Sequence, residues 1–486
     1  MKMKIKPYPA ELKFYEKITT PDRVTEEFME IDGWNRSWKQ YIPSSFTGKE
    51  PIPMVISMHG GDEHNAEYRT GWALIAEREG FVALFPQCIE NGETWNTWNT
   101  YKREDGKPNE LIYLDTLIEH MVQKYNIDRE RIYMHGQSMG DSMTTWYTFE
   151  RGELFAAAAP FSGHTPPSRF VGEDGSIVTK PHCPLPVIRT HGSEDMNLII
   201  GKNNIPTKDA SKRASKSPAL TDFDPATITE AMRIQQIELF HLMQTKVWTE
   251  CNGCRKLPML SLRGRYAAYC FHGEPCDFIY YTVNGGFHGT YIDMADYIWS
   301  YFFTNFRRVN GKIVRTQPNK TFVPDRGAVA LAEGADKAYV NNELAEMPGG
   351  VAHIVEGVAY APALWMEKLF PGVHVDMLYD GQGAEFTFGS KAVQVAMNNR
   401  VVVCNETLVD INRTLVLDGQ LYVPVGDLAG LLMGKKACAG YSAGYVNDCG
   451  GEMSFDLAYV IRRILGVQKE STPLDCLHQE QKLSRD

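Results

Sequence analysis

The stretch from Ile132 to Ser142, IYMHGQSMGDS, contains a Gly-x-Ser-x-Gly pattern centred on Ser138. Such a short pattern arises by chance in many chains, so the alternative to a nucleophile is a serine between two loop glycines. The flanks favour the nucleophile, because an apolar β-type run precedes the pattern and a helical pattern follows it. In a strand–turn–helix context the glycines let the two elements approach closely, while the serine hydroxyl stands exposed on a strained turn. We therefore predict that Ser138 is a catalytic nucleophile at a helix N-terminus, where the helix dipole favours developing negative charge.

The segments around this turn alternate between short apolar runs and helical patterns. The strand candidates are PMVISMHG (53–60), FVALFPQ (81–87), RIYMHG (131–136), FAAAAPF (155–161), PVIRTHG (186–192) and DFIYYTVNGG (277–286). Helices are expected over residues 110–125 and from Met139 to about Glu150, and a β-hairpin over about residues 25–45. Strands that are apolar throughout indicate a parallel sheet covered on both faces. The sequence thus predicts an α/β fold with a mostly parallel sheet, whose ligands lie at the carboxyl ends of the strands.

Two residues that could activate Ser138 follow predicted strands. A serine hydroxyl needs a general base, and the base needs a carboxylate that orients it. In α/β-hydrolases the order along the chain is serine, acid, histidine. Asp195 follows the strand PVIRTHG, and His288 follows the strand DFIYYTVNGG. We predict that Asp195 is the orienting acid and that His288 is the general base.

Neighbouring titratable residues are weaker candidates for these roles. Glu194 adjoins Asp195 but is expected to face solvent. The other histidines considered for the site are expected to be structural or to lie on the surface: His135, His164, His191 and His272.

Acyl transfer also needs hydrogen-bond donors for the oxyanion that forms at the substrate carbonyl. One expected donor is the backbone N–H of Met139, the residue after the nucleophile. The other is expected from the loop after an early strand, where the sequence reads His59-Gly60-Gly61-Asp62. Glycines there let backbone N–H groups face a substrate without an intervening side chain. Gly60, Gly61 and Asp62 are therefore the predicted loop side of the oxyanion hole.

Two tryptophans are candidates for substrate contact. Trp95 and Trp98 lie between the strand at 81–87 and the helix at 110–125, near the carboxyl edge of the sheet. They could stack on an aromatic acyl group. The alternative is that one packs under the loop and the other lies at the rim.

Composition and charge exclude several classes of partner. The 486 residues carry a net charge of -10, which argues against nucleic-acid binding. No apolar run approaches the length of a membrane span. The predicted chemistry requires neither a cofactor nor a metal, and we expect none. The N-terminus lacks an apolar stretch of signal-peptide length, which leaves open a cytoplasmic protein or an exported one whose leader is not in this sequence. The oligomeric state stays open.

Ten cysteines do not decide the redox compartment. Four of them cluster, and zinc binding, disulfides and free thiols all stay open: Cys251, Cys254, Cys270 and Cys276.

The composition and periodicity of the sequence change at two places after residue 196. Residues 197–275 are expected to form an insertion over the sheet, either a lid or a loop without a role in the site, with a helix capped by Asp224 and Pro225 in its first turn. Residues 311–326 are expected to be a linker between a catalytic domain (1–310) and a duplicated accessory domain (327–466). The duplication is visible as VEGVAYAPALWMEKLF (355–370) and LDGQLYVPVGDLAGLL (417–432). The polar tail, 467–486, is expected to fray.

Residues from about 32 to 308 resemble the esterases that include polyhydroxybutyrate depolymerases and feruloyl esterases. The likeness is carried by DGWNRSWKQYIPSSF, PMVISMHGG, AEREGFVALFPQ, YNIDRERIYMHGQSMG, PVIRTHGSED and YYTVNGGFHG. It implies an α/β-hydrolase fold and the roles given above for Ser138, Asp195 and His288. It also implies a disulfide between Cys254 and Cys276 if the protein is exported. Asp141 departs from the family, which has a small residue there, and this departure concerns local helix packing.

Residues of about 327–465 resemble the small duplicated domain named after the N-terminal part of copper amine oxidases. Copper itself is not expected, because His353, His374 and His478 have no ligand-like spacing. Attachment, substrate presentation or a structural role beside the catalytic domain are the alternatives.

Together these features predict a serine carboxylic-ester hydrolase that forms an acyl-enzyme. Hydroxycinnamoyl esters, small or linked to polysaccharides, are the expected substrates. The alternatives are polyhydroxybutyrate, acetyl or other short-chain esters, a peptidase of the same fold, or a non-catalytic binding protein on a hydrolase fold.

Overall fold

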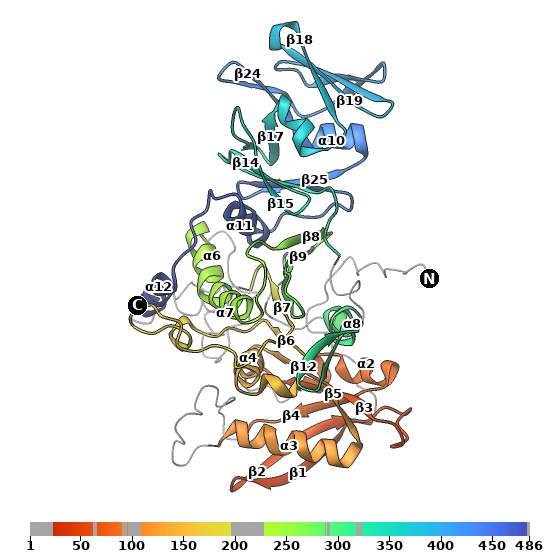
Figure 1. The fold of residues 1–486 in the computed structure, drawn as a ribbon, viewed down its shortest axis with the longest axis vertical. Coiled ribbons are helices and arrows are strands. Elements are labelled where there is room, and N and C mark those ends of the chain that lie inside the picture. Colours follow the sequence, from red (N-terminus) through yellow and green to blue (C-terminus); the bar gives the residue numbers. More distant parts are fainter. Residues whose placement is uncertain are drawn as a thin grey trace, which may run out of the picture.

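The computed structural model describes residues 23–61, 66–89, 95, 108–195, 228–286, 288, 292–316 and 323–483. Its largest element is a ten-stranded sheet with the order β1-β2-β4-β3-β5-β6-β7-β10-β9-β8. The strands are β1 Thr25–Ile31, β2 Trp34–Tyr41, β3 Ile52–Met58, β4 Val82–Pro86, β5 Ile127–Gln137, β6 Ala157–Phe161, β7 Val187–Gly192, β8 Met259–Arg263, β9 Tyr266–Phe271 and β10 Phe278–Val283. The central strands from β4 to β10 pair in parallel, and the two outer strands on each side pair antiparallel. The predicted α/β fold is thus confirmed (Figure 1).

Helices cover the sheet where the sequence alternates between strand and helix. They are α1 Ala66–Arg69, α2 Trp72–Glu79, α3 Glu110–Tyr125, α4 Met139–Arg151, α6 Glu230–Ile237, the π-helix η6 Glu238–Leu242, α7 Met243–Cys251 and α8 Ile292–Tyr301. The side chain of Asn109 caps α3 by accepting from the backbone N–H groups of Leu111 and Ile112. Asn126, in the left-handed region at φ 48°, ends the same helix. The predicted helix at 110–125 therefore has the expected bounds.

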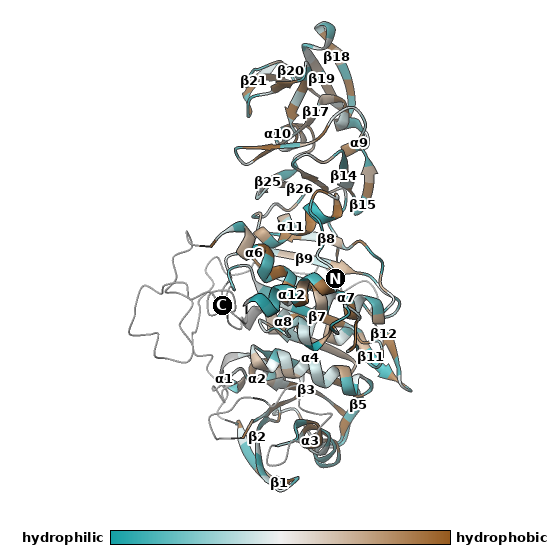
Figure 2. Ribbon diagram, turned by 90° about the vertical axis from the view of Figure 1, so that its left-hand side faces the viewer, coloured by the Kyte–Doolittle hydropathy of each residue, from teal (hydrophilic) through white to brown (hydrophobic). Residues whose placement is uncertain are grey.

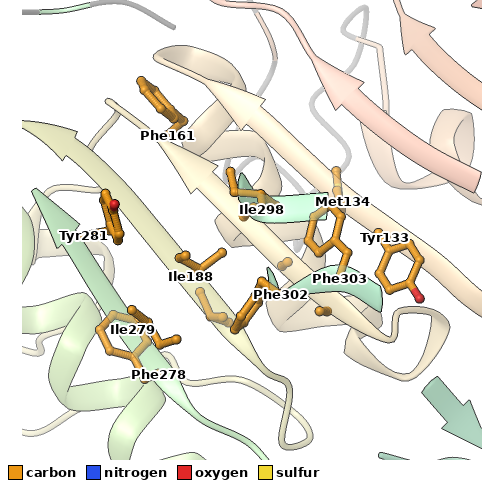
Figure 3. Close-up of a cluster of buried hydrophobic side chains, with 14 of the residues drawn as sticks. Tyr133, Met134, Phe161, Ile188, Phe278, Ile279, Tyr281, Ile298, Phe302 and Phe303 are labelled. Carbon is orange, nitrogen blue, oxygen red and sulfur yellow. The ribbon is translucent and has the colours of Figure 1, made fainter. Parts of the chain in front are cut away.

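The hydrophobic core lies between the central strands and these helices. Tyr133, Met134 and Ile188 on the strands are buried against Ile298 and Phe303, which lie on and just after α8 (Figure 3). Every residue of β3, β4, β6, β7 and β10 is buried. This burial on both faces explains why these strands read as continuous apolar runs. None of the described helices is long and apolar enough to cross a membrane.

The C-terminal part is built from antiparallel sheets. One sheet has the order β15-β14-β13-β26-β25, a second β16-β17-β24-β23, and a third β18-β19-β20-β21-β22. Their strands are β13 Val329–Ala332, β14 Lys337–Val340, β15 Glu343–Glu346, β16 His353–Val355, β17 Val358–Pro362, β18 His374–Leu378, β19 Gly383–Phe388, β20 Lys391–Ala396, β21 Val401–Cys404, β22 Thr407–Asp410, β23 Leu415–Leu417, β24 Gln420–Pro424, β25 Lys436–Gly440 and β26 Ala443–Asn447. The helices are α9 Met366–Leu369, α10 Val425–Met433, α11 Phe455–Ile464 and α12 Pro473–Leu483.

The two sequence repeats meet in the second of these sheets. Strand β17 of the first copy pairs antiparallel with strand β24 of the second, and Tyr360 lies opposite Pro424 while Pro362 lies opposite Tyr422. Because Tyr and Pro occupy the same positions in both copies, this pairing relates the copies by a local two-fold axis. A short helical segment follows each strand, as the repeat in the sequence requires.

Four sequence predictions need correction. The insertion does not simply lie over the sheet, because β8 and β9 extend the sheet itself. The expected linker contains β12 Lys312–Arg315, which pairs with β11 Phe306–Val309. The expected frayed tail forms α12, in which Cys476 and Leu477 are buried. The insertion helix α6 is capped by Thr229, while Asp224 and Pro225 lie outside the described residues.

Asp325 ties the C-terminal sheets to β8, the edge strand of the ten-stranded sheet. Its carboxylate accepts hydrogen bonds from the backbone N–H of Leu262 at 2.8 Å, from Asn447 Nδ2 at 2.7 Å and from the Tyr445 hydroxyl at 3.1 Å. Helix α11 lies between the two sets of sheets in both views (Figures 1 and 2). One hydrophobic core cluster includes residues from both sides of this junction.

Candidate active site

Ser138 lies on a sharp turn between β5 and α4. Its backbone has φ 58° and ψ −117°, a conformation that is strained for a residue with a side chain. A Cβ atom on Gly136 would lie 2.2 Å from the carbonyl oxygen of Gly140, so the turn closes only with glycine there. The Ser138 side chain is thereby held at the N-terminus of α4, as the sequence pattern predicted.

The structure brings Ser138, His288 and Asp195 together from three separate loops. His288 Nε2 lies 3.0 Å from Ser138 Oγ, and His288 Nδ1 lies 3.0 Å from Asp195 Oδ2. Both distances are hydrogen bonds. Asp195 is held in turn, because its backbone N–H donates to the Gly192 carbonyl and its own carbonyl accepts from Gln236 Nε2 at 2.9 Å. This chain of contacts can move a proton from the serine to an oriented imidazole.

The rival acid and one rival base have other partners. Glu194 forms an ion pair with Arg233 at 2.9 Å. His272 lies 2.9 Å from Asp277 in a loop and is 42% exposed.

Two histidines on strands of the ten-stranded sheet are buried, and burial keeps both imidazoles uncharged near pH 7. His135 contacts the Ser57 hydroxyl at 3.0 Å, and burial lowers the pKa of His135 to about 3. His191 lies 3.9 Å from the Asp195 carboxylate, and burial lowers the pKa of His191 to about 4. His164 accepts a hydrogen bond at its backbone carbonyl from Ser142 Oγ. Among the described histidines, His288 is the one that contacts Ser138.

The predicted oxyanion loop runs beside the nucleophile. A Cβ atom on Gly60 would lie 3.3 Å from the Ser138 Cβ, so the loop after β3 passes directly over the turn. Met139 is the first residue of α4, and the N–H groups of a first helical turn have no partner within the helix. Gly61 follows Gly60 in the same loop, and Asp62 lies outside the described residues.

Trp95 supports this loop rather than facing a substrate. It is 2% exposed, its indole N–H donates to the His59 carbonyl at 2.9 Å, and its ring packs 4.6 Å from the His59 ring. His59 in turn accepts from the backbone N–H of Cys88. The expectation that Trp95 stacks on an acyl group is therefore wrong, because its ring is enclosed. Trp98 lies outside the described residues.

Asp141, the departure from the family pattern, is buried in an ion pair. Its carboxylate lies 3.0 Å from Arg189 Nη1 and accepts from the backbone N–H of Gly163 at 3.0 Å. Arg189 also donates to the Gly163 carbonyl and to Gln244. Both charged side chains are at most 1% exposed. The pair ties the first turn of α4 to β7 and to α7, so the acidic residue fits where the family has a small one.

A second buried carboxylate, that of Asp456, lies near the predicted acid and has no signal in the sequence. Asp456 on α11 is 6% exposed, and its Oδ2 lies 3.9 Å from His191 Nε2. Burial raises the pKa of Asp456 to about 8, and the nearby carboxylates of Glu194 and Asp195 act in the same direction. Asp456 comes from a helix remote in sequence, with no motif around it, so only the folded chain reveals this neighbour.

The cysteine cluster is reduced in the structure. All ten cysteines are free, although Cys254 Sγ lies 3.5 Å from the Cys276 carbonyl oxygen. The implied Cys254–Cys276 disulfide is therefore not formed. Within the described ranges, no group of three or more His, Cys, Asp or Glu side chains is arranged to hold a metal.

Comparison with known proteins finds a family match for the segment that carries Ser138. Residues 36–179 match the family model described as Esterase PHB depolymerase. This segment is similar to that esterase family. Ser138, its strand and its helix all lie within the matched residues.

Curated proteins are similar to this chain over part of their length. A bifunctional acetylxylan esterase/xylanase of Neocallimastix patriciarum is 28% identical over 175 residues, which are 36% of this chain and 23% of the relative. Feruloyl esterase B of Piromyces equi is 23% identical over 254 residues, 51% of this chain and 41% of the relative. The chain thus spans less than half the length of either relative.

Among solved structures, an acetyl xylan esterase from Aspergillus awamori is 16% identical with a TM-score of 0.40. The match covers 58% of this chain and 99% of that one.

Proposed function

We propose that this chain is a serine carboxylesterase that works through an acyl-enzyme. The observation that carries the proposal is the continuous hydrogen-bond chain from Ser138 Oγ through His288 to Asp195, with 3.0 Å at each step. The esterase family match over residues 36–179 supports the same reaction class.

The first half of the reaction acylates the serine. His288 Nε2 accepts the proton of Ser138 Oγ while this oxygen attacks the ester carbonyl carbon. The carbonyl oxygen becomes an oxyanion, which the backbone N–H of Met139 and the Gly60–Gly61 loop would stabilise. When the tetrahedral intermediate collapses, His288 gives its proton to the leaving alcohol. Asp195 stabilises the imidazolium in between.

The second half returns the enzyme to its starting state. A water molecule takes the place of the alcohol, and His288 accepts a proton from it as the water attacks the acyl carbon. Collapse of the second intermediate breaks the bond to Ser138 Oγ, releases the carboxylic acid and returns the proton to Ser138.

For the substrate we infer acetyl or hydroxycinnamoyl esters of plant cell-wall polysaccharides. Support comes from the relatives, whose names specify acetylxylan esterase and feruloyl esterase. Polyhydroxyalkanoate depolymerase is also among the similar proteins, so this polymer is the alternative.

For residues 327–466 we infer a structural role beside the esterase, and their likeness to the amine-oxidase repeat domain stays a proposal. The buried hydrogen bonds of Asp325 support this role, because they tie the C-terminal sheets to β8.

One experiment tests the reaction and the substrate class. A fluorophosphonate probe should label the wild-type chain and leave Ser138→Ala unlabelled. Hydrolysis is then measured on acetylated xylan, methyl ferulate, a polyhydroxybutyrate suspension and a peptide amide. Turnover of an ester with none of the amide supports the proposal. Labelling without turnover of any ester would overturn it in favour of a binding protein.

A further inference from the structure

A cavity of about 290 Å³ is lined in part by Asp456, whose Oδ2 lies 3.9 Å from His191 Nε2. Its walls come from the insertion helices, from β9 and β10, and from α11 of the C-terminal part. Ser138 and His288 are not among its lining residues. The cavity is therefore distinct from the predicted catalytic site, and its size is near the lower end of the range for small-molecule pockets.

Three side chains in its walls carry polar atoms that have no hydrogen-bond partner among the described residues. Both ring nitrogens of His241, the hydroxyl of Tyr280 and Oδ2 of Asp456 have no hydrogen-bond partner within the part of the chain that the structure describes. Their side chains belong to residues that are 5%, 5% and 6% exposed. A buried polar group without a partner is unfavourable, so a group of them around one cavity favours a ligand that would satisfy them.

These groups favour an uncharged ligand. Burial lowers the pKa of His241 well below its usual range and raises the pKa of Asp456 to about 8, so both are neutral near pH 7. Each then offers both a donor and an acceptor. The basic residues of the lining do not change this, because Arg463 pairs with Glu470 at 2.6 Å and Lys256 is exposed.

The remaining walls favour a flat ring. Tyr269 and Tyr280 stand parallel with ring centroids 5.4 Å apart, and Phe271 and Tyr459 complete an aromatic lining. Aromatic faces of this kind stack on aromatic rings. We propose that this cavity binds a small uncharged aromatic molecule that carries hydroxyl groups, with its ring on the tyrosines and its hydroxyls on His241, Tyr280 and Asp456.

Binding is measured without turnover, by isothermal titration calorimetry on full-length Ser138→Ala protein. The probes are phenol and resorcinol, with benzylamine, benzoate and toluene as charged or non-polar counterparts of similar size. The two phenols should bind at least tenfold more tightly than the other three. Equal affinity for toluene and phenol, or preference for a charged probe, overturns the proposal. No binding of phenol or resorcinol at millimolar concentration would mean that the cavity holds only water, which also overturns it.

Matched variants assign the binding to this cavity. Tyr280→Phe removes the hydroxyl without a partner and should weaken phenol binding at least fivefold with little change in Tm. Tyr269→Phe removes a hydroxyl that already pairs with Thr282 Oγ1 at 2.6 Å, so phenol binding should stay within twofold. Val460→Phe should fill part of the cavity and weaken binding. If Tyr280→Phe and Val460→Phe both bind phenol as the parent does, the probe is bound elsewhere.

A labelling arm separates this proposal from the catalytic one. Wild-type protein treated with the fluorophosphonate should bind phenol as the untreated protein does, because the cavity does not include Ser138. Loss of phenol binding after labelling would mean that the probe occupies the catalytic site and would overturn the cavity assignment. If no ester is hydrolysed but phenol still binds to Ser138→Ala, only the catalytic proposal fails.

Discussion

Single side chains around the serine turn can be separated by substitution. Asp195 and Glu194 are adjacent in sequence, yet only Asp195 contacts His288, while Glu194 pairs with Arg233. Separate substitutions of Asp195 and Glu194 therefore test the catalytic proposal.

Asp195→Asn should lower kcat by roughly 10⁴, as loss of the orienting carboxylate does in a serine triad. Glu194→Gln is the matched control and should keep most of the activity, because Glu194 pairs with Arg233 while Asp195 holds His288. Steady-state hydrolysis of a nitrophenyl ester by both variants checks this. A larger loss in Glu194→Gln than in Asp195→Asn would exchange the two roles.

Asp141→Ala should destabilise the protein by about 3–5 kcal/mol, because it leaves the Arg189 charge buried without its carboxylate. Glu119→Ala, which breaks the exposed pair with Arg129, is the control and should cost less than about 1 kcal/mol. Urea unfolding of the two variants measures both values. Similar midpoints would contradict the importance of the buried pair.

Helix α11 makes the stability of the chain dependent on pH through Asp456. The folded protein keeps the Asp456 proton up to about pH 8, whereas the unfolded chain releases it near pH 4. The folded state therefore binds more protons between these values, and the contribution of Asp456 to stability falls as pH rises from about 4 to about 8.

Asp456→Asn should remove this dependence, because an amide stays neutral. The wild-type free energy of unfolding should lose at most about 1.4 kcal/mol per pH unit in that window through this group. The variant should match wild type near pH 4 and exceed it near pH 8.5, as measured by urea unfolding at both pH values. A wild-type advantage at pH 8.5 would mean that Asp456 is ionised when folded.

Elements near the site were predictable because each had a strong local signal. The six strand candidates match β3 to β7 and β10, since fully buried parallel strands are apolar throughout. Strand β8 was missed because it is an antiparallel edge strand, in which MLSLR alternates in burial. Strand β9 is apolar and buried, but it lies in the segment that was expected to be an insertion over the sheet. Asp456 and Arg189 were beyond prediction, since their importance comes from partners distant in sequence.

At the scale of the whole molecule, most of the C-terminal sheets pack around a core cluster of their own. Asp325 bonds both to β8 and to β26, and residues of β13, β26 and α11 belong to the same core cluster as the ten-stranded sheet. Such a shared core predicts that both parts unfold together. The end of the expected linker, which carries Asp325, therefore holds the two parts together and does not act as a hinge.

Asp325→Ala should split one calorimetric unfolding transition into two, because it removes the acceptor of three buried donors from both sides of the junction. Asp336→Ala changes an exposed carboxylate of the same C-terminal part and should leave one transition. Scanning calorimetry of both variants checks this. A single transition with unchanged midpoint in Asp325→Ala would contradict the shared core.

The position of Asp456 has a consequence for how the protein is made. Asp195 and Asp456 are far apart in the polypeptide, so the strands that carry Ser138, Asp195 and His288 leave the ribosome well before α11 does. The nascent chain can assemble the serine turn early, but the cavity wall that carries Asp456 is completed only when α11 docks. The chain can therefore complete its fold only after α11 has been synthesised.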